Sequence, residues 1–350
     1  MAAPLVSRMQ LWEIDDQSWF PPFLRAYVQA GLTHTWTVRV PLLQARSPAT
    51  AVADTLRRVL GERNVGRYTY IDFCSGAGGP TPSIERTLNQ QLLVLSQPPP
   101  PPPSSSSSRD KERKKRRRNG AAKDGSTGGD ANGNGSASRA PDDGAVQFVL
   151  TDLHPNVESW AAAAAKSEHL TYVPQPIDAA DAPPDLLRQC VRNGGRRAGR
   201  EKKGVFRLFN LAFHHFDDDL ARGILKNTVE TSDGFGIFEL QDRSLGSVLS
   251  CLVFGLGILL LAPLLYWRRP ARLFWVYVVP VVPFVLVFDA FISSLRTRTA
   301  PEVEELLRGC GADPARLARW RVRSGRELFL WPCGYMSWII CTKEKDLARG

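Results

Sequence analysis

The chain has 350 residues and a formal net charge of +10, and 43% of its residues are hydrophobic. This hydrophobic content suffices for a packed core and excludes a chain that is disordered throughout. The positive excess lies in two short tracts, residues 109–118 and 192–203, so the remainder is close to neutral and no specific nucleic-acid partner is expected.

The N-terminal part, residues 1–66, is interpreted as a helical lid or packing segment. It holds the aromatic and acidic stretch LWEIDDQSWFPPFLRAYV and a predicted helix at 49–60, with Ser47 or Thr50 as its cap. Its first twenty residues carry charges where a signal peptide would be apolar. Six scattered cysteines form no Cys-x-x-Cys pair, and no histidines stand at metal-ligand spacing. We therefore expect a reducing, cytosolic environment, no disulfide framework and no metal site.

The central motif is YTYIDFCSGAGGPTP, residues 68–82. Its apolar start predicts a strand leading to Asp72, followed by a Gly-x-Gly turn at Gly76 and Gly78 and a helix at 83–95. Glycines in such a turn allow backbone N–H groups to approach a ligand, and the next helix offers its positive N-terminal end. A dinucleotide fingerprint would require glycine where Thr81 stands, which disfavours a nicotinamide cofactor.

The spacing Asp-x-x-x-Gly-x-Gly resembles the first motif of class I S-adenosylmethionine-dependent methyltransferases. In that family the acid orients the methionine end of the cofactor through the turn, and the glycines face it. The resemblance therefore implies S-adenosylmethionine as cofactor, bound at Asp72, Ser75, Gly76, Ala77 and Gly78.

A low-complexity insertion at 97–144 separates the first part of the expected methyltransferase domain (67–96) from the second (145–243). Its proline and serine runs, basic tract and Gly-rich end cannot bury enough apolar surface to offset the entropy of ordering, so we expect disorder. The tract KERKKRRR has three open interpretations: a nuclear-localisation or nucleic-acid patch, an anionic-lipid patch, or a solvated stretch without function.

Four further strands are predicted near 147–151, 170–177, 204–210 and 234–240. The resemblance implies that acids or amides after these strands bind the cofactor. Asp152 would receive the ribose hydroxyls, because a carboxylate can accept two hydrogen bonds, and Asp178 and Asn210 would lie near the adenine and the methyl group.

The segment FHHFDD follows the fourth strand and carries the catalytic candidates His214 and His215. One of them would take the acceptor's proton, since imidazole titrates near neutral pH. The alternative is that both serve packing and capping beside the neighbouring phenylalanines.

Two apolar runs, 245–267 and 273–291, predict a transmembrane helical hairpin over 244–293. Each is near the ~20 residues needed to cross a bilayer, and aromatic residues surround the connecting turn. Three arginines in the turn balance three at the outer ends, so the positive-inside rule does not separate full crossing from a one-leaflet hairpin. A buried helix pair inside a soluble core is the alternative.

Residues 294–350 then supply a helix at 301–308 and two strands, at 319–323 and 334–341. The whole pattern predicts an α/β fold: a doubly wound, seven-stranded, mainly parallel sheet interrupted by the insertion and the hairpin. As in class I methyltransferases, the last strand would be antiparallel.

The segments IDDQSWFP, DFCSGAGGP, FHHFDD and SSLRTRTAPEVEELL resemble a membrane-associated group of these methyltransferases. This resemblance implies a membrane-bound enzyme that faces the cytosol and methylates a small, lipophilic acceptor, with the lipid bilayer as partner. The alternatives are a membrane-tethered adaptor without catalysis and a nicotinamide oxidoreductase.

Overall fold

The computed structural model describes residues 4–96, 145–193 and 203–344. The insertion predicted at 97–144 lies outside the described residues, as does most of the second basic tract.

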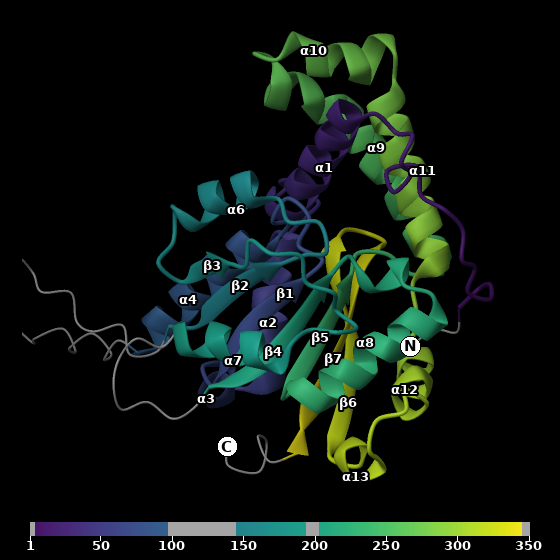
Figure 1. The fold of residues 1–350 in the computed structure, drawn as a ribbon. Helices are drawn as coiled ribbons and strands as arrows, with labels where there is room; N and C mark the ends of the chain where they lie inside the picture. The colour runs from purple at the N-terminus through teal and green to yellow at the C-terminus, as the bar shows by residue number, and fades with distance from the viewer. Residues whose placement is uncertain (1–3, 97–144, 194–202, 345–350) are drawn as a thin grey trace, which may run out of the picture.

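Seven strands form one sheet in the order β3-β2-β1-β4-β5-β7-β6 (Figure 1). Neighbouring strands from β3 to β5 pair in parallel, whereas β7 is antiparallel to both β5 and β6, so β7 alone runs against the others. The prediction of a seven-stranded, mainly parallel sheet with an antiparallel last strand is confirmed. The strands are β1 Tyr68–Phe73, β2 Gln147–Thr151, β3 Leu170–Tyr172, β4 Gly204–Asn210, β5 Gly234–Glu239, β6 Trp320–Leu330 and β7 Gly334–Lys343.

Two strands differ in length from the prediction. β3 ends at Tyr172 rather than near residue 177, because Pro174 and Pro176 have no N–H to donate to a ladder. β6 continues to Leu330 rather than ending near residue 323. Its second half is a half-buried edge with a weak apolar pattern, which gave no sequence signal for a strand.

Helices cover both faces of the sheet, because side chains along each strand point alternately to opposite sides. Tyr70 and Phe148 belong to the core on one face, and Ile71 and Val149 to the core on the other. The first face is covered by α2 Pro48–Leu60, α4 Thr81–Ser96 and α6 Val157–Ala164, and the second by α7 Pro184–Asn193, α8 Asp218–Thr231 and α12 Ala300–Arg308. Ser47 caps α2, with its Oγ accepting a hydrogen bond from Thr50 N at 3.3 Å. The short elements are α3 Glu62–Val65, the 3₁₀ turn η1 Phe213–His215 and α13 Pro314–Leu317.

A helical arm stands above the carboxyl ends of the parallel strands (Figure 1). It consists of α1 Pro22–Thr37, α9 Leu245–Tyr266, α10 Pro270–Leu273, the π-helical turn Phe274–Val278 and α11 Val281–Arg296. A separate apolar cluster holds the arm together, including Leu24 and Val28 of α1, Ala262 of α9 and Leu286 of α11. The sequence pattern did not predict α1.

The second apolar run is not the single helix that was predicted. It breaks before Val281 and bends by 66°, because Pro280 cannot donate a helical hydrogen bond at that point. In the part of the chain that the structure describes, α9 is the one unbroken helix long and apolar enough to cross a membrane, and the bent pair would be a second only if counted as one span. Two straight transmembrane helices are therefore not confirmed.

Candidate functional site

The turn after β1 has a conformation that allows a ligand to approach its backbone closely. Gly76, Gly78 and Gly79 have φ values of 51°, 104° and 49°, in the left-handed region that favours glycine. A Cβ added at Gly78 would meet side chains only at 3.9 Å, so conformation rather than lack of space requires glycine there. The turn leads directly into α4, whose first turn presents backbone N–H groups beside it.

Asp72, at the end of β1, connects the turn, α4 and β4. Its Oδ2 accepts a hydrogen bond from Thr81 Oγ1 at 2.5 Å, and its Oδ1 accepts one from Asn210 Nδ2 at 3.3 Å. Burial raises the pKa of Asp72 to about 7, although the hydrogen bonds from Thr81, Ser75 and Asn210 oppose this increase. Asp72 therefore supports the conformation of the turn through its hydrogen bonds, and its ionisation state sets the charge beneath the turn.

Asp152, directly after β2, lies against the same turn. Its Oδ2 accepts from Gly76 N and its Oδ1 from His154 N, each at 2.8 Å. Trp160 Nε1 donates to Gly76 O at 2.9 Å and holds the other side of the turn. Because each carboxylate oxygen can accept a second hydrogen bond, Asp152 keeps acceptor capacity for a ligand's hydroxyl groups.

Asn210 and Asp178 differ in how they meet the cavity described below. Asn210 lies in its wall, and its Oδ1 is buried without a hydrogen-bond partner among the described residues. The next residue, Leu211, has a φ of 54°, which is costly for a non-glycine residue. Asp178 is exposed, is not part of the cavity wall, and caps Ala180 N at 2.8 Å.

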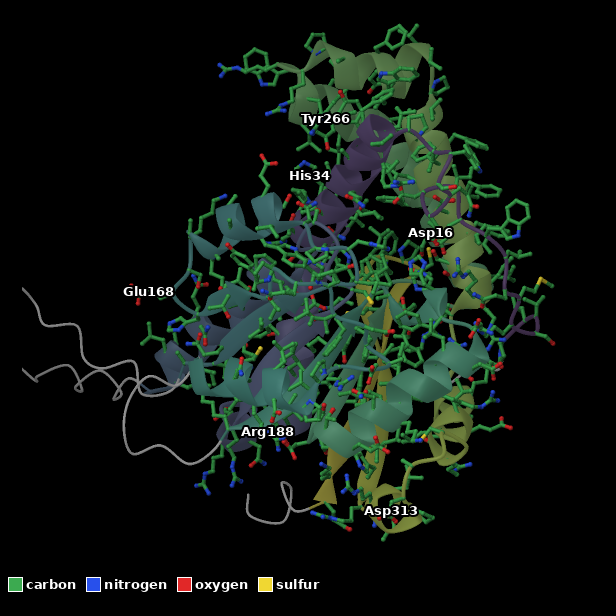
Figure 2. The ribbon with its side chains drawn as sticks, viewed as in Figure 1. Asp16, His34, Glu168, Arg188, Tyr266 and Asp313 are labelled. Carbon is green, nitrogen blue, oxygen red and sulfur yellow. The ribbon has the colours of Figure 1, made fainter. Side chains whose placement is uncertain are left out.

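A cavity of about 760 Å³ runs from the glycine turn into the helical arm. Ser75, Gly76 and Ala77 line it at the turn, followed by Asn210 at the end of β4 and by His214 and His215 of η1. Its remaining wall is mostly apolar and comes from α1, α9 and α11, including Leu32, Val253, Phe254, Ile258, Leu261 and Leu286. Figure 2 labels two further lining residues, His34 of α1 and Tyr266 of α9, whose ring centroids are 5.7 Å apart.

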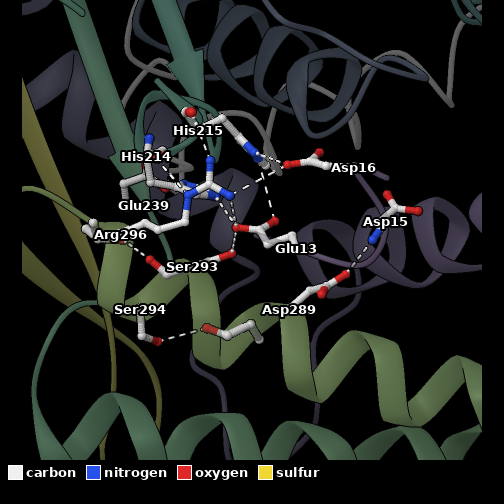
Figure 3. A network of polar contacts seen from close by, with 12 residues as sticks. Glu13, Asp15, Asp16, His214, His215, Glu239, Asp289, Ser293, Ser294 and Arg296 are labelled. Atoms are coloured by element: carbon white, nitrogen blue, oxygen red, sulfur yellow. Dashed lines mark hydrogen bonds and ion pairs between the residues drawn. The ribbon is translucent and has the colours of Figure 1, made fainter. Parts of the chain in front are cut away.

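His214 is buried at this wall and is held by carboxylates. Its Nδ1 is 2.8 Å from Glu239 Oε2, and its Nε2 is 3.5 Å from Glu13 Oε1 (Figure 3). Burial alone would lower the pKa of His214, but attraction to Glu239 and Glu13 outweighs it and raises the pKa to about 10. A histidine that is already protonated at neutral pH cannot take a proton from an acceptor, which argues against the predicted role for His214.

His215 is the more accessible of the pair. Its side chain is 32% exposed, and its Nδ1 is 3.0 Å from Asp16 Oδ2. The rings of these two neighbouring residues are 4.2 Å apart between centroids, and both residues line the cavity.

Sequence reasoning missed the acids of the N-terminal strap, which we define as residues 4–21. Glu13, Asp15 and Asp16 of this strap line the cavity. Ile14 N and Asp15 N donate to the carboxylate of Asp289 at 2.7 and 3.0 Å, which fastens the strap to α11. The segment is thus part of the site wall as well as a packing element, and its only sequence signal was the acidic, aromatic run EIDDQSW.

Comparison with protein-family models and with curated protein sequences gives no match. Among solved structures, the chain is similar to an S-adenosylmethionine-dependent methyltransferase from Anabaena variabilis, with 13% identity and a TM-score of 0.39, over 97% of this chain and 100% of that one. It is also similar to an O-methyltransferase family protein from Burkholderia thailandensis (11% identity, TM-score 0.36, 85% of this chain and 56% of that one).

A third similar structure is human N-acetylserotonin methyltransferase in complex with S-adenosylmethionine (12% identity, TM-score 0.35, 84% of this chain and 54% of that one). This chain spans little more than half the length of the Burkholderia and human proteins. A likeness this weak does not establish a shared activity.

Proposed function

We propose that the chain is a class I S-adenosylmethionine-dependent methyltransferase that acts on a small lipophilic acceptor at a membrane surface. The observation that carries this proposal is that one continuous cavity joins the glycine turn to the apolar helical arm. The strand order with its one antiparallel strand, the acid at the end of β1 and the acid after β2 support the assignment of the cofactor end.

The described residues fit this cofactor. The positive-φ glycines leave room for a ligand against the backbone, Asp152 retains acceptor capacity for ribose hydroxyls, and the orphaned Asn210 Oδ1 can accept a hydrogen bond from the cofactor. S-adenosylmethionine, when bound, supplies an electrophilic methyl group. Because Asp178 is exposed and does not line the cavity, it would contact only the outer edge of the adenine.

The apolar part of the cavity would hold the acceptor and exclude water. Fixing its nucleophilic atom toward the turn would supply most of the rate increase, since methyl transfer depends on alignment of the reacting atoms. Of the two histidines, His215 is the candidate for handling the acceptor's proton, either as a base beside Asp16 or through a cation that it helps to bind, as argued below.

The test of the cofactor is calorimetric titration of the full chain in detergent micelles with S-adenosylmethionine, its demethylated product and NAD in parallel. We expect the first two to bind and NAD to show no heat of binding. Binding of NAD alone would overturn the proposal. Binding of S-adenosylmethionine without transfer to any acceptor in a series of increasing lipophilicity would favour the adaptor alternative.

A further inference from the structure

We propose that His214, His215 and Glu13 bind one divalent transition-metal ion in the wall of the cavity. One ligand atom from each of these residues lies within 4.8 Å of the other two (Figure 3). The histidines come from η1 and the glutamate from the N-terminal strap, so only the folded chain brings them together. No metal site was expected from the sequence because Glu13 lies far along the chain from the two histidines.

The Nδ1 atom of each imidazole, which points away from Glu13, is within hydrogen-bond distance of a carboxylate. Nδ1 of His214 is 2.8 Å from Glu239 Oε2, and Nδ1 of His215 is 3.0 Å from Asp16 Oδ2. Histidines that bind metals almost always donate their second ring N–H to a carboxylate, carbonyl or water, which fixes the tautomer and leaves the inner nitrogen as the ligand. The cluster shows this arrangement twice, with both Nε2 atoms directed toward Glu13.

The inner nitrogen of His214 has no hydrogen-bond partner among the described residues, although its side chain is only 1% exposed. Its closest carboxylate oxygen, Glu13 Oε1, is 3.5 Å away. Buried polar atoms are nearly always satisfied, and one that is not requires a physical reason. A cation bonded to this nitrogen provides such a reason.

The charge around the cluster also favours a dication. Arg296 Nη1 lies 3.3 Å from Glu13 Oε1 and 3.6 Å from Asp16 Oδ2. Because His214 is protonated when no ion is bound, a bound ion would have to displace the proton from its Nε2. With both histidines then neutral, the three carboxylates of Glu13, Asp16 and Glu239 against this one guanidinium leave a formal charge of minus two, which one divalent ion would balance. Ser293 Oγ also donates to Glu13 Oε1 at 2.8 Å, so Oε2, which lies 3.9 Å from His215 Nε2, is the oxygen left for the ion.

The three ligand atoms must move closer together to bind one ion. Metal–nitrogen bonds of about 2.0–2.1 Å place ligand atoms about 3.3 Å apart in a tetrahedral site. The half-exposed ring of His215 can supply this movement, whereas His214 is held in the core. Two imidazoles and one carboxylate with open positions suit ions such as Fe²⁺, Zn²⁺ or Co²⁺, and the open positions would face the cavity.

The site itself does not depend on methyl transfer, but its role rests on the proposed function. An acceptor hydroxyl bound to the ion would lose its proton to solvent more readily, and the resulting oxygen anion would accept the methyl group as the carbon–sulfur bond of the cofactor breaks. In that case His215 acts as a ligand rather than as a base.

The experiment loads the metal-stripped full chain, in detergent micelles, with Co²⁺ and follows its visible absorption. We expect one Co²⁺ per chain, and affinity about tenfold weaker or worse in His214→Ala, His215→Ala and Glu13→Gln. Glu239→Gln should weaken affinity by about 10–100-fold through the orientation of His214. His34→Ala is the matched control, because His34 lines the same cavity from α1, away from the cluster, and should leave Co²⁺ affinity unchanged.

A second measurement protects the test against variants that fail to fold. Electron paramagnetic resonance of the Cu²⁺-loaded unmodified chain should show coupling to two imidazole nitrogens. Absence of nitrogen coupling, or Co²⁺ affinity unchanged in a folded His215→Ala, would overturn the metal site. Calorimetry with S-adenosylmethionine on the same samples separates the metal site from the proposed function. Binding of the cofactor without binding of metal refutes only the metal site. Binding of metal without binding of the cofactor refutes only the proposed function.

Discussion

Asp152 contacts the glycine turn through Oδ2, which accepts from Gly76 N, while its Oδ1 accepts from His154 N. Removing Asp152 therefore tests the cofactor end of the cavity. In Asp152→Ala, the ribose hydroxyls would lose a charged acceptor, and each such hydrogen bond contributes about 1.5–3 kcal/mol. We expect the affinity for S-adenosylmethionine to fall at least tenfold in calorimetry. Asp152→Asn, which keeps one acceptor oxygen, should lose less, and the exposed Asp185→Ala should behave as the unmodified chain. Unchanged affinity in Asp152→Ala would remove this residue from the site.

Asp72 gives a prediction for pH dependence. Its pKa is about 7 in the folded protein against an ordinary value of 3.8, so its ionisation costs stability progressively as the pH rises from about 4 to 7. Asp72→Asn should therefore melt a few degrees above the unmodified, ligand-free protein at pH 8, and the difference should vanish near pH 4. S-adenosylmethionine should stabilise the variant less than the unmodified protein. Equal melting temperatures at pH 8 would contradict the raised pKa.

The residues of the glycine turn could be predicted because their chemistry and their position lie in one continuous stretch, from Asp72 to Gly78. Glu13 and Asp16 could not be predicted in the same way. They reach the cavity only because the strap is fastened along α11, and no local pattern records a contact made across nearly the whole chain. The ionisation of His214 was equally hidden, since it depends on two carboxylates brought in from the strap and from β5.

Among the contacts that hold the strap, those with Asp289 join two of its backbone amides to one side chain. Asp289 accepts both Ile14 N and Asp15 N, so Asp289→Ala leaves two strap amides without their acceptor. We expect a loss of about 1–3 kcal/mol in unfolding free energy and faster proteolysis within residues 4–21. Asp219→Ala, at an exposed carboxylate of α8 that pairs with Arg222 of the same helix, should have little effect on either measurement. Equal proteolysis in the two variants would contradict the fastening role of Asp289.

The flanks of the predicted insertion are held together without it. Asn89 of α4 donates to Val146 O at 3.1 Å and accepts from Val146 N at 2.8 Å, just before β2. Replacing residues 97–144 with a short Gly-Ser linker should therefore preserve folding and S-adenosylmethionine binding, because loop closure depends weakly on length. A shortened chain that folds but does not bind the cofactor would show that the removed segment contributes to the site.

The elements that were predicted well are those with a strong local period, such as β4, which begins and ends where expected. The failures have local causes as well. Prolines shortened β3 and broke the second apolar run, and α1 was missed because polar residues such as Gln29 and His34 interrupt its apolar pattern. These polar residues are tolerated because they face the cavity.

For the whole molecule, the strap bears on how the arm meets a membrane. The strap follows α11 from Leu295, whose carbonyl accepts a hydrogen bond from Met9 N at 3.1 Å, toward the tip of the arm. There the strap leads into α1, where the rings of Phe23 and Trp275 pack with their centroids 5.6 Å apart. Full crossing would place this non-helical, acidic segment in hydrocarbon, which is costly. Most of the exposed leucines of α9 instead form one face at helical spacing, which includes Leu245, Leu249, Leu252, Leu256, Leu260 and Leu264. We therefore favour an arm that lies along the cytosolic interface with this face immersed.

The test is cysteine labelling at the tip in sealed vesicles with an impermeant reagent. We expect Arg269→Cys to be labelled from the cytosolic face, because an arm in the interface leaves its tip among the headgroups. Labelling from the lumenal face alone would establish full crossing. Methylation of only water-soluble acceptors by the full chain in these vesicles would contradict the lipophilic substrate.

The place of the arm between β5 and β6 has a consequence for how the protein is made. β5 leaves the ribosome well before β7, its antiparallel neighbour from Gly234 opposite Thr342 to Glu239 opposite Ser337. Throughout that interval the sheet has an open edge, and an unpaired edge invites aggregation. The apolar arm emerges in the same interval, and under the proposed membrane association it would reach lipid before the last two strands can close the sheet. We therefore expect synthesis on membrane-bound ribosomes, with delivery of the arm to lipid preceding completion of the domain.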